Sequence, residues 1–379
     1  MTIEVLRTDQ LSEDDAAAWS HLQQSNDVLM NPFFSLEFAR AVAEVRGRVD
    51  VAIQRQQGQP VGFLPFELVR RGIGKPVATR VSEVQGIIGD GNVEWDPAEF
   101  LRSAGLSSWT FDSLPVCQRS FQAFAFCQED SPYIDLSEGF DAYQSARRSA
   151  GSNQIAQAFR KARKIEREIG PLRFELHTAD QDAIAALFSW KKEQYARTGA
   201  FDVFCLDWVK ALLQHLCEVQ NADFGGILSA LYVQDQVIAV HMGIRSANVL
   251  AWWFPAFDRR YDNYSPGLIL LTKVLQSVGS VGIERIDLGR GSERYKTSFQ
   301  TGACVVAEGV VDGRVVHWTL RRGAALAREW AETSTLGRPA LHVVRRARQW
   351  IAHRNSLPAD SYINRNAAPS ISPPKTGLD

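Results

Sequence analysis

The sequence has few cysteines and histidines, and none is spaced as a metal site would need. Its five cysteines are odd in number, and no two of them stand in a Cys-x-x-Cys spacing. Its seven histidines form no His-x-x-x-His pair. Structural zinc requires closely spaced thiolate or imidazole ligands, so this pattern predicts a protein without a metal. It also favours reduced thiols in an intracellular protein.

Long apolar runs and an excess of charge of one sign are also missing. No apolar stretch approaches the roughly 20 residues that a membrane-spanning helix requires. The start, at residues 1–6, lacks the basic-then-apolar pattern of a secretory signal. We therefore expect a cytoplasmic protein. The net charge of −1 gives no reason to expect DNA as a partner, so only local basic segments could bind a polyanion.

What the chain does have is length and an ordinary share of apolar residues. Its 379 residues are 45% hydrophobic and 22% charged, which is typical of a globular protein with more than one domain. We expect an amino-terminal half at 1–148 and a catalytic half at 149–320. A basic helical extension at 321–354 and a disordered tail at 355–379 would follow.

The segment 225–257 predicts an antiparallel meander of three strands. Two apolar runs, 226–233 and 237–245, flank a polar turn, and a third run covers 249–257. Branched and aromatic residues dominate these runs, as is usual in strands. The expected sheet would stand at the centre of the second half.

A helix and a short strand should follow the meander. Ser265 is a favoured N-cap residue, Pro266 suits the first helical position, and Gly267 follows them. Apolar residues at helical spacing continue to Val278, and a strand is expected at 283–288. A helix start between two strands predicts an anion pocket, because its free N–H groups and dipole attract phosphate.

Four short segments carry a family resemblance. They are Trp190-Lys191-Lys192-Glu193-Gln194-Tyr195, Thr198-Gly199-Ala200-Phe201-Asp202-Val203-Phe204, Tyr264-Ser265-Pro266-Gly267, and Asp287-Leu288-Gly289-Arg290-Gly291 with Tyr295-Lys296. Together with the order of elements over 149–299, they resemble the acyl-CoA-binding core of the GNAT acetyltransferases. More narrowly, they resemble the CelD/BcsL-type branch, which is related to the FemABX peptidyltransferases. A weaker echo of that family's amino-terminal half stands at 31–35.

The resemblance implies an α/β fold with two tandem GNAT-like halves around a shared cleft, in which helices flank mixed sheets. An internal duplication agrees with this, since Gln59-Pro60-Val61 and Gln236-Val237-Ile238 each start an apolar strand after a polar turn. The alternative, that any two hairpins look alike, stays open.

Acyl transfer to an amine needs a polarised carbonyl and a group that takes the amine proton. The candidate bases are His241, in the middle of the meander, and Asp287, at the end of a strand. His241 could instead be a satisfied core residue, and Asp287 could instead cap the loop that follows it. Tyr295 is a candidate to protonate the leaving thiolate.

Binding residues are expected around the same helix start. The expected contacts to the acyl carrier are Ser265, Pro266, Gly267, Arg259 and Lys296, although Lys296 could instead pair with Glu293 on a helical turn. Those expected to contact the acceptor are Lys191, Tyr195 and Arg290.

Two basic segments add possible anion contacts. A helix is expected at 154–169, and its cations could bind phosphate on a nucleotide, a lipid carrier or RNA, or could simply face water. The extension at 321–354 could lie on an anionic membrane, bind a cyclic dinucleotide, or pack on the core. The cations are Arg160, Lys161, Arg163, Lys164 and Arg167 in the first segment and Arg321, Arg322, Arg328, Arg338, Arg345, Arg346, Arg348 and Arg354 in the second.

The leading hypothesis is an N-acyltransferase with acetyl-CoA as the acyl donor. The resemblance implies a sugar or lipid-linked saccharide acceptor in exopolysaccharide biosynthesis, with the enzyme peripheral on the inner face of the cytoplasmic membrane. One alternative is Fem-like transfer from aminoacyl-tRNA. Another is a GNAT-derived effector that binds cyclic di-GMP through 321–354.

Overall fold

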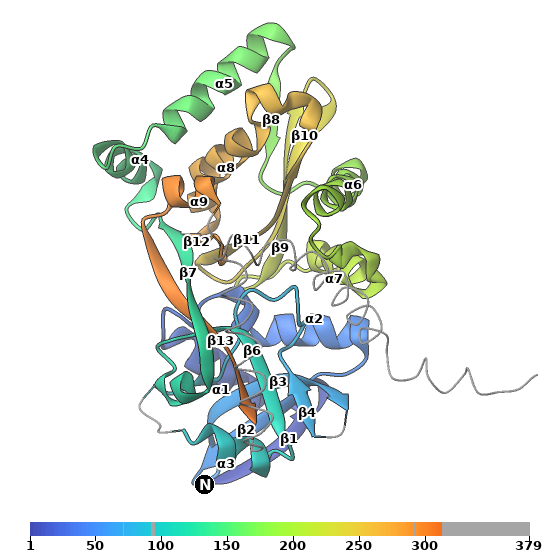
Figure 1. Ribbon diagram of the computed structural model, residues 1–379, viewed down its shortest axis with the longest axis vertical. Coiled ribbons are helices and arrows are strands. Elements are labelled where there is room, and N and C mark those ends of the chain that lie inside the picture. Colours follow the sequence, from blue (N-terminus) through green and yellow to red (C-terminus); the bar gives the residue numbers. More distant parts are fainter. Residues whose placement is uncertain (71, 92–94, 292, 313–379) are drawn as a thin grey trace, which may run out of the picture. The chain divides into compact units, whose positions relative to one another are not determined.

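A computed structural model describes residues 1–70, 72–91, 95–291 and 293–312, and all of these lie in one compact unit. Thirteen strands of these residues form one continuous mixed sheet with helices on both of its faces (Figure 1). The predicted α/β fold is confirmed. The basic extension at 321–354 and the tail beyond it lie outside the described residues. Within the described ranges, no helix is long and apolar enough to span a membrane.

The first half contains the elements up to β7. Its strands and helices are β1 Thr2–Arg7, α1 Glu13–Gln24, α2 Leu36–Arg46, β2 Asp50–Gln56, β3 Gln59–Arg70, β4 Ile73–Lys75, β5 Ile88–Gly89, α3 Pro97–Ser103, β6 Ser108–Pro115 and β7 Ala125–Asp135. Short 3-10 helices are η1 Thr8–Gln10, η2 Pro32–Phe34 and η3 Arg119–Phe124.

The second half follows directly. Its strands and helices are α4 Gly139–Ser149, α5 Gln154–Glu168, β8 Leu172–Glu175, α6 Gln181–Thr198, α7 Asp207–Glu218, β9 Gly225–Val233, β10 Gln236–Arg245, β11 Val249–Phe257, α8 Pro266–Ser277, β12 Arg285–Asp287, α9 Arg294–Phe299 and β13 Gly302–Asp312. Its 3-10 helices are η4 Val203–Cys205, η5 Arg259–Tyr264 and η6 Val278–Val281.

The two halves repeat one topology. Each half contains a strand, two helices, three strands, a helix and a further strand in this order. In the first half these are β1, α1, α2, β2, β3, β4, α3 and β6, and in the second half β8, α6, α7, β9, β10, β11, α8 and β12. The fourth strand of each set runs parallel to the fifth, β4 to β6 and β11 to β12, whereas the other neighbours within each set pair antiparallel. Gln59 and Gln236 each start the third strand of their set, so the internal duplication is confirmed.

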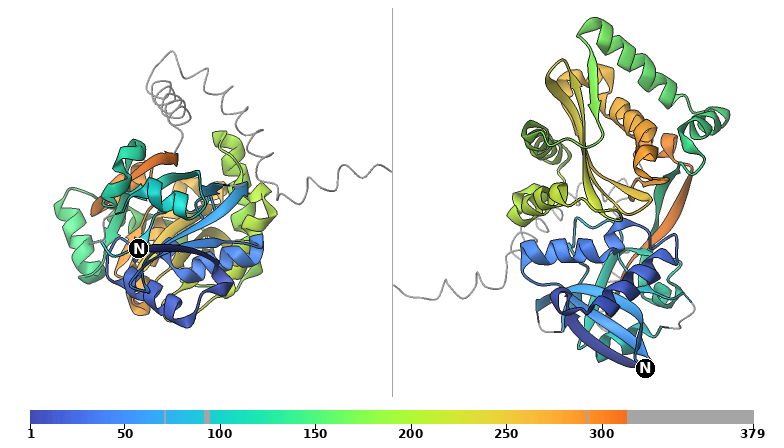
Figure 2. Two further views of the ribbon diagram at one scale, coloured as in Figure 1. Left: turned by 90° about the horizontal axis from the view of Figure 1, so that it is seen from below. Right: turned by 180° about the vertical axis from the view of Figure 1, so that it is seen from behind.

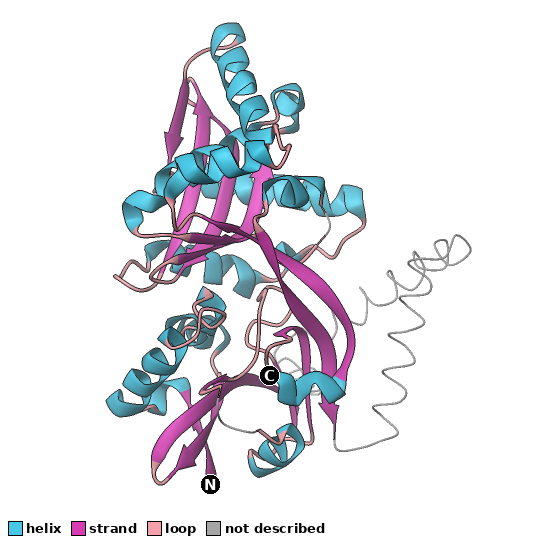
Figure 3. Cartoon of the chain, turned by 90° about the vertical axis from the view of Figure 1, so that its left-hand side faces the viewer, coloured by secondary structure: helices cyan, strands magenta, loops and turns pink. Residues whose placement is uncertain are grey.

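The last strand of each half pairs with the other half. Strand β7, from the first half, lies against β12 with Tyr133 opposite Asp287. Strand β13, from the second half, lies between β7 and β6, with Val311 opposite Trp109. These two long strands run side by side in Figures 1 and 3. The sequence predicts a hairpin of strands at 304–310 and 314–319 that completes the sheet. The first of these strands, β13, instead joins the two sheets into one, and the second lies outside the described residues.

Helices cover both faces of the second sheet (Figure 2). On one face α6 and α7 share a core with α1 and α2, which extends from Trp19 to Trp253. On the other face α4, α5 and α8 pack around Ile165 and Leu270. Because both faces are covered, all nine residues of β9 are buried, and the strand reads as a continuous apolar run.

The junction strand β13 generates a testable prediction. A Cβ added at Gly309 would collide with the carbonyl oxygen of Phe124, at the end of η3, and with the ring of Phe111 in β6. We expect Gly309→Ala to lower the free energy of unfolding by about 1–3 kcal/mol, the usual cost of overpacking. Chemical denaturation monitored by tryptophan fluorescence would measure this.

The matched control is Gly279→Ala, an exposed position in η6 with no heavy atom within 4 Å of the added Cβ. It should leave stability unchanged or raise it by about 0.4–1 kcal/mol. Equal effects of the two substitutions would contradict the central place of β13.

Candidate active site

A cavity of about 580 Å³ opens where β11 and β12 separate. The two parallel strands pair over three residues only, from Val249 opposite Arg285 to Ala251 opposite Asp287. Next to this point the pairing of β11 with β10 shifts register opposite Gly243, which places one extra residue in β11. Such a bulge bends a strand and increases its twist. Beyond it, β11 continues without β12 beside it.

The cavity takes its walls from both halves of the described chain. Strand β11 and helix α6 form two sides, and the start of α8 and the loop from β12 to α9 form the others. Glu83 is the one lining residue from the first half among those described. Members of the lining include Trp190, Lys191, Arg197, Trp252, Trp253, Phe257, Arg259, Ser265, Gly267, Arg290, Tyr295 and Lys296.

The start of α8 differs from the expected cap. Ser265 has a left-handed backbone with φ of +49°, and its hydroxyl makes no capping hydrogen bond to α8. That hydroxyl instead accepts a hydrogen bond of 2.6 Å from Nζ of Lys161 in α5. Pro266 has no N–H, and the N–H of Leu268 already binds the Ser265 carbonyl. The helix start therefore offers Gly267 N–H, with the Lys161 ammonium beside it.

Helix α5 lies against this end of the cavity. Besides Lys161, it places Nζ of Lys164 at 5.3 Å from the Tyr264 ring centroid, and Glu168 accepts a hydrogen bond of 2.9 Å from the Tyr264 hydroxyl. Arg160 and Arg163 are exposed and form no ion pair with a described residue. Helix α5 thus places Lys161 on a lining residue of the cavity, whereas Arg160 and Arg163 face water. The phosphate contact expected of this segment stays a prediction.

Glu83 brings a carboxyl group into the cavity from the loop between β4 and β5. Both of its carboxylate oxygens lie close to the backbone of Gly289, at 2.8 Å from where a Cβ would stand on that residue. Burial raises the pKa of Glu83 to about 8, although the positive charges of Lys296, Lys191 and Arg290 oppose this rise. A carboxyl group with such a pKa is suited to act as a general base near neutral pH.

Lys296 is buried but fully occupied. Its Nζ donates to the carbonyl oxygens of Gly289 and Arg290, at 3.2 and 2.8 Å, and lies 3.1 Å from a carboxylate oxygen of Glu293. The helical-turn pair that the sequence offered as an alternative is therefore present. Arg290 in turn donates to the backbone carbonyl of Asp112 in the first half. These contacts hold the loop after β12 in place.

Lys191 is buried among aromatic rings. Its Nζ lies 5.9 Å from the ring centroids of both Tyr195 and Phe254. Burial lowers the pKa of Lys191 to about 8. Tyr195 does not line the cavity. Its ring packs beside Lys191, and its ring centroid lies 6.1 Å from that of Phe204.

Tyr295 lines the cavity at the start of α9. Burial raises the pKa of its phenol, and the negative charges of Glu293 and Glu83 add to this effect. The phenol is therefore protonated at neutral pH and available as a hydrogen-bond or proton donor.

The structure places the two expected bases outside the cavity lining. His241 is fully buried and its ring stacks on Trp252 with centroids 3.7 Å apart. Burial lowers the pKa of His241 to about 3, so the ring is neutral across the physiological range. This is the core position that its place in a central strand also allowed.

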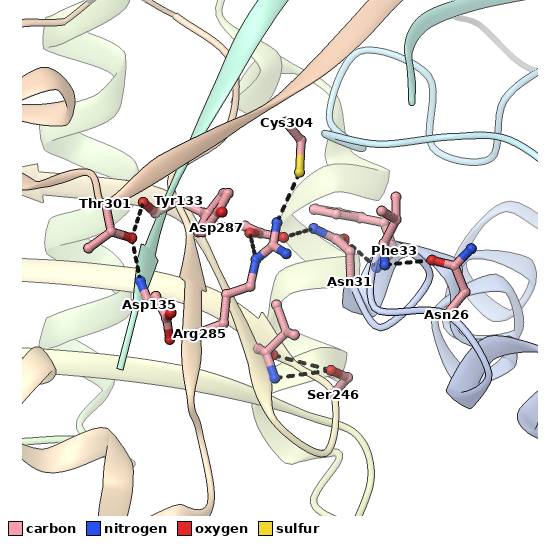
Figure 4. Close-up of polar contacts among 12 residues, drawn as sticks. Asn26, Asn31, Phe33, Tyr133, Asp135, Ser246, Arg285, Asp287, Thr301 and Cys304 are labelled. Atoms are coloured by element: carbon pink, nitrogen blue, oxygen red, sulfur yellow. Dashed lines mark hydrogen bonds and ion pairs between the residues drawn. The ribbon is translucent and has the colours of Figure 1, made fainter. Parts of the chain in front are cut away.

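Asp287 is occupied by contacts that join the two halves (Figure 4). Its carboxylate accepts hydrogen bonds from Asn31 of the first half at 2.7 Å and from Nε of Arg285 at 2.6 Å. The Arg285 guanidinium also donates to the sulfur of Cys304 and lies 4.1 Å from the Tyr133 ring centroid. The Asp287 carboxylate thus holds the end of β12 against the first half and does not cap the loop that follows.

Sequence patterns could not identify Glu83. It stands in a polar, glycine-rich segment at 72–96 that predicts loops near a cleft, but nothing in that segment distinguishes one carboxylate from another. Its contact with Gly289 joins residues more than 200 positions apart, which local periodicity cannot reveal.

Comparison with known proteins agrees with this architecture. Residues 152–297 match the model of the acetyltransferase (GNAT) domain family. The crystal structure of FemX is similar with a TM-score of 0.53 at 9% identity, covering 84% of this chain and all of that one. A search of curated protein sequences found no match.

Two further structures are similar at lower scores. The C-terminal domain of a putative lysylphosphatidylglycerol synthetase from Agrobacterium fabrum has a TM-score of 0.47 at 13% identity, covering 82% of this chain and 94% of that one. A tandem GNAT protein from the clavulanic acid biosynthesis pathway has a TM-score of 0.45 at 10% identity, covering 82% and 98%. The match over 152–297 includes α5 and every element of the second half that lines the cavity, so this chain carries an acetyltransferase (GNAT) domain, the domain of an acyltransferase.

Proposed function

We propose that this acyltransferase moves an acyl group from an acyl-CoA, acetyl-CoA in the simplest case, to a primary amine, with Glu83 as the general base. The observation that carries the proposal is a carboxyl group of raised pKa in the same cavity as the unpaired edge of β11. The chemistry needs both, because an amine must lose a proton as it attacks and the carbonyl oxygen must be stabilised.

The donor would lie along β11 with its phosphates at the start of α8. Gly267 N–H, Lys161 and Ser265 are grouped there, and Arg259 stands beside them in an exposed ion pair with Asp262 at 3.6 Å. N–H groups on the open edge of β11 would polarise the thioester carbonyl. This arrangement leaves the carbonyl carbon facing the part of the cavity that contains Glu83.

The proposed transfer proceeds by direct attack. The amine nitrogen bonds to the carbonyl carbon, its proton passes to the Glu83 carboxylate, and the carbon–sulfur bond breaks. The leaving thiolate takes a proton from the Tyr295 phenol. Lys296 and Arg290 act indirectly, since they hold the loop between β12 and α9.

The acceptor is proposed from the family resemblance as a sugar or lipid-linked saccharide of exopolysaccharide biosynthesis. A membrane contact through 321–354, or a cyclic dinucleotide there, remains a proposal about residues outside the described part of the chain. An aminoacyl-tRNA donor is the second candidate, since Arg160 and Arg163 are exposed beside the donor end of the cavity. Calorimetry with acetyl-CoA and with charged tRNA separates the two donors.

Gly267→Val tests where the donor binds. A Cβ at Gly267 would lie 3.2 Å from the Phe257 ring, and the larger side chain would project over the proposed phosphate position. We expect the Kd for acetyl-CoA to rise at least about tenfold, a loss of roughly 1.4 kcal/mol. Gly279→Val, at the far end of the same helical segment, is the matched control. Equal affinity of the two variants would contradict this donor site.

Glu83→Gln tests the general base. Because the base must be deprotonated, kcat/KM of the natural protein should rise with pH around a midpoint near 8. The variant should lose about 10²–10⁴-fold in kcat/KM together with that midpoint, while the Kd for acetyl-CoA stays the same. Thiol release with a panel of primary amines measures this. Glu166→Gln, exposed on α5, is the control, and a Glu83→Gln variant with the natural pH profile would exclude Glu83 as the base.

A further inference from the structure

Lys191 is the one buried charge on its turn of α6. The residue is 7% exposed, whereas the neighbouring Lys192, Glu193 and Gln194 are all exposed. The position lines the cavity, so the ammonium group is directed inward although the helix around it faces water.

Three other cations of the cavity already have partners in the protein, and a fourth, Arg197, is exposed to water. Lys296 has two carbonyl oxygens and Glu293, Arg290 has Asp112, and Arg259 has Asp262. Lys191, by contrast, forms no hydrogen bond or ion pair with any residue in the described ranges. Its neighbours are the faces of Tyr195 and Phe254.

A buried ammonium without an anion is unfavourable unless a ligand supplies one. Contacts with aromatic faces offset only part of the lost hydration. Glu83 acts on Lys191 through its charge but lies too far away for an ion pair. The cavity therefore contains the Glu83 carboxyl group and the Lys191 ammonium group at two separate positions, and no described side chain pairs with either of them.

We propose that the amine acceptor carries an acidic group, a carboxylate or a phosphate ester, which binds to the Lys191 ammonium while the amine faces Glu83. This substrate class rests on the proposed function. An ammonium group and a carboxyl group at fixed positions would orient a molecule with an anion at one end and an amine at the other. The anion would hold the nucleophilic nitrogen beside Glu83, and neutral amines would lack that anchor.

Matched acceptor pairs test the proposal. L-Tyrosine is compared with tyramine, and D-glucosamine 6-phosphate with D-glucosamine, by calorimetry without donor and by thiol release with acetyl-CoA. We expect at least about tenfold preference for the anionic member of one pair, and the pair that shows it identifies the anion as carboxylate or phosphate. In Lys191→Met the preference for the anionic member over the neutral member of that pair should fall close to one. Lys191→Arg should keep part of this preference, and Lys192→Met should keep all of it.

The outcomes separate this inference from the proposed function. Failure of acetyl-CoA to bind would contradict the proposed donor, whereas the calorimetric preference for anionic amines does not depend on the donor. Equal affinities within both pairs for the natural protein, or a preference that persists in Lys191→Met, would overturn the role of Lys191.

Thermal stability provides a second readout. If Lys191 is held for a ligand, Lys191→Met removes an unpaired buried charge and should keep or raise the Tm of the free protein. The anionic amine should raise the Tm of the natural protein and not that of the variant. A marked fall in Tm for Lys191→Met would mean that the lysine serves the fold, and would overturn the proposal.

Discussion

The short pairing between β11 and β12 is the constraint on which the site depends. Three residue pairs join the strands, and the bulge opposite Gly243 then bends β11 away. Gly243 is needed there, because a Cβ would collide with the Ala251 carbonyl and the His241 ring. If the strands had stayed paired, no cavity would separate α6 from α9, and the start of α8 would face a closed sheet.

The duplicated first half has the same elements, but a tryptophan side chain lies across its strands. Its parallel pair, β4 and β6, is even shorter, and α3 starts with Pro97 much as α8 starts with Pro266. The Trp95 indole, however, lies across Gly62 and Gly89 of neighbouring strands, where any side chain would collide with it. The first half has kept the architecture and contributes Glu83 to the site of the second half. The two copies thus differ in role: the second half forms most of the cavity wall, and the first half provides one carboxyl group, that of Glu83.

Much of the fold could be predicted, since periodicity and capping residues are local signals. The three strands of the meander, β9 to β11, agree with the predicted runs to within one residue, and α5 begins at Gln154 as the sequence indicates. Several candidate site residues do line the cavity, among them Lys191, Gly267 and Tyr295. The remaining features depend on contacts distant in sequence. Glu83 lies close to Gly289, the Ser265 hydroxyl accepts a hydrogen bond from Lys161 instead of capping α8, and the Asp287 carboxylate accepts one from Asn31.

The exchange of β7 and β13 also bears on how the chain is made. Strand β6 ends at Pro115, and its sheet neighbour β13 starts at Gly302, 187 residues later. At the usual rates of translation, this separation is roughly 10–40 s. During that time the first half leaves the ribosome with one edge of its sheet unpaired, and unpaired strands invite association with other chains. The edge of β6 is therefore open to such association until β13 has been synthesised.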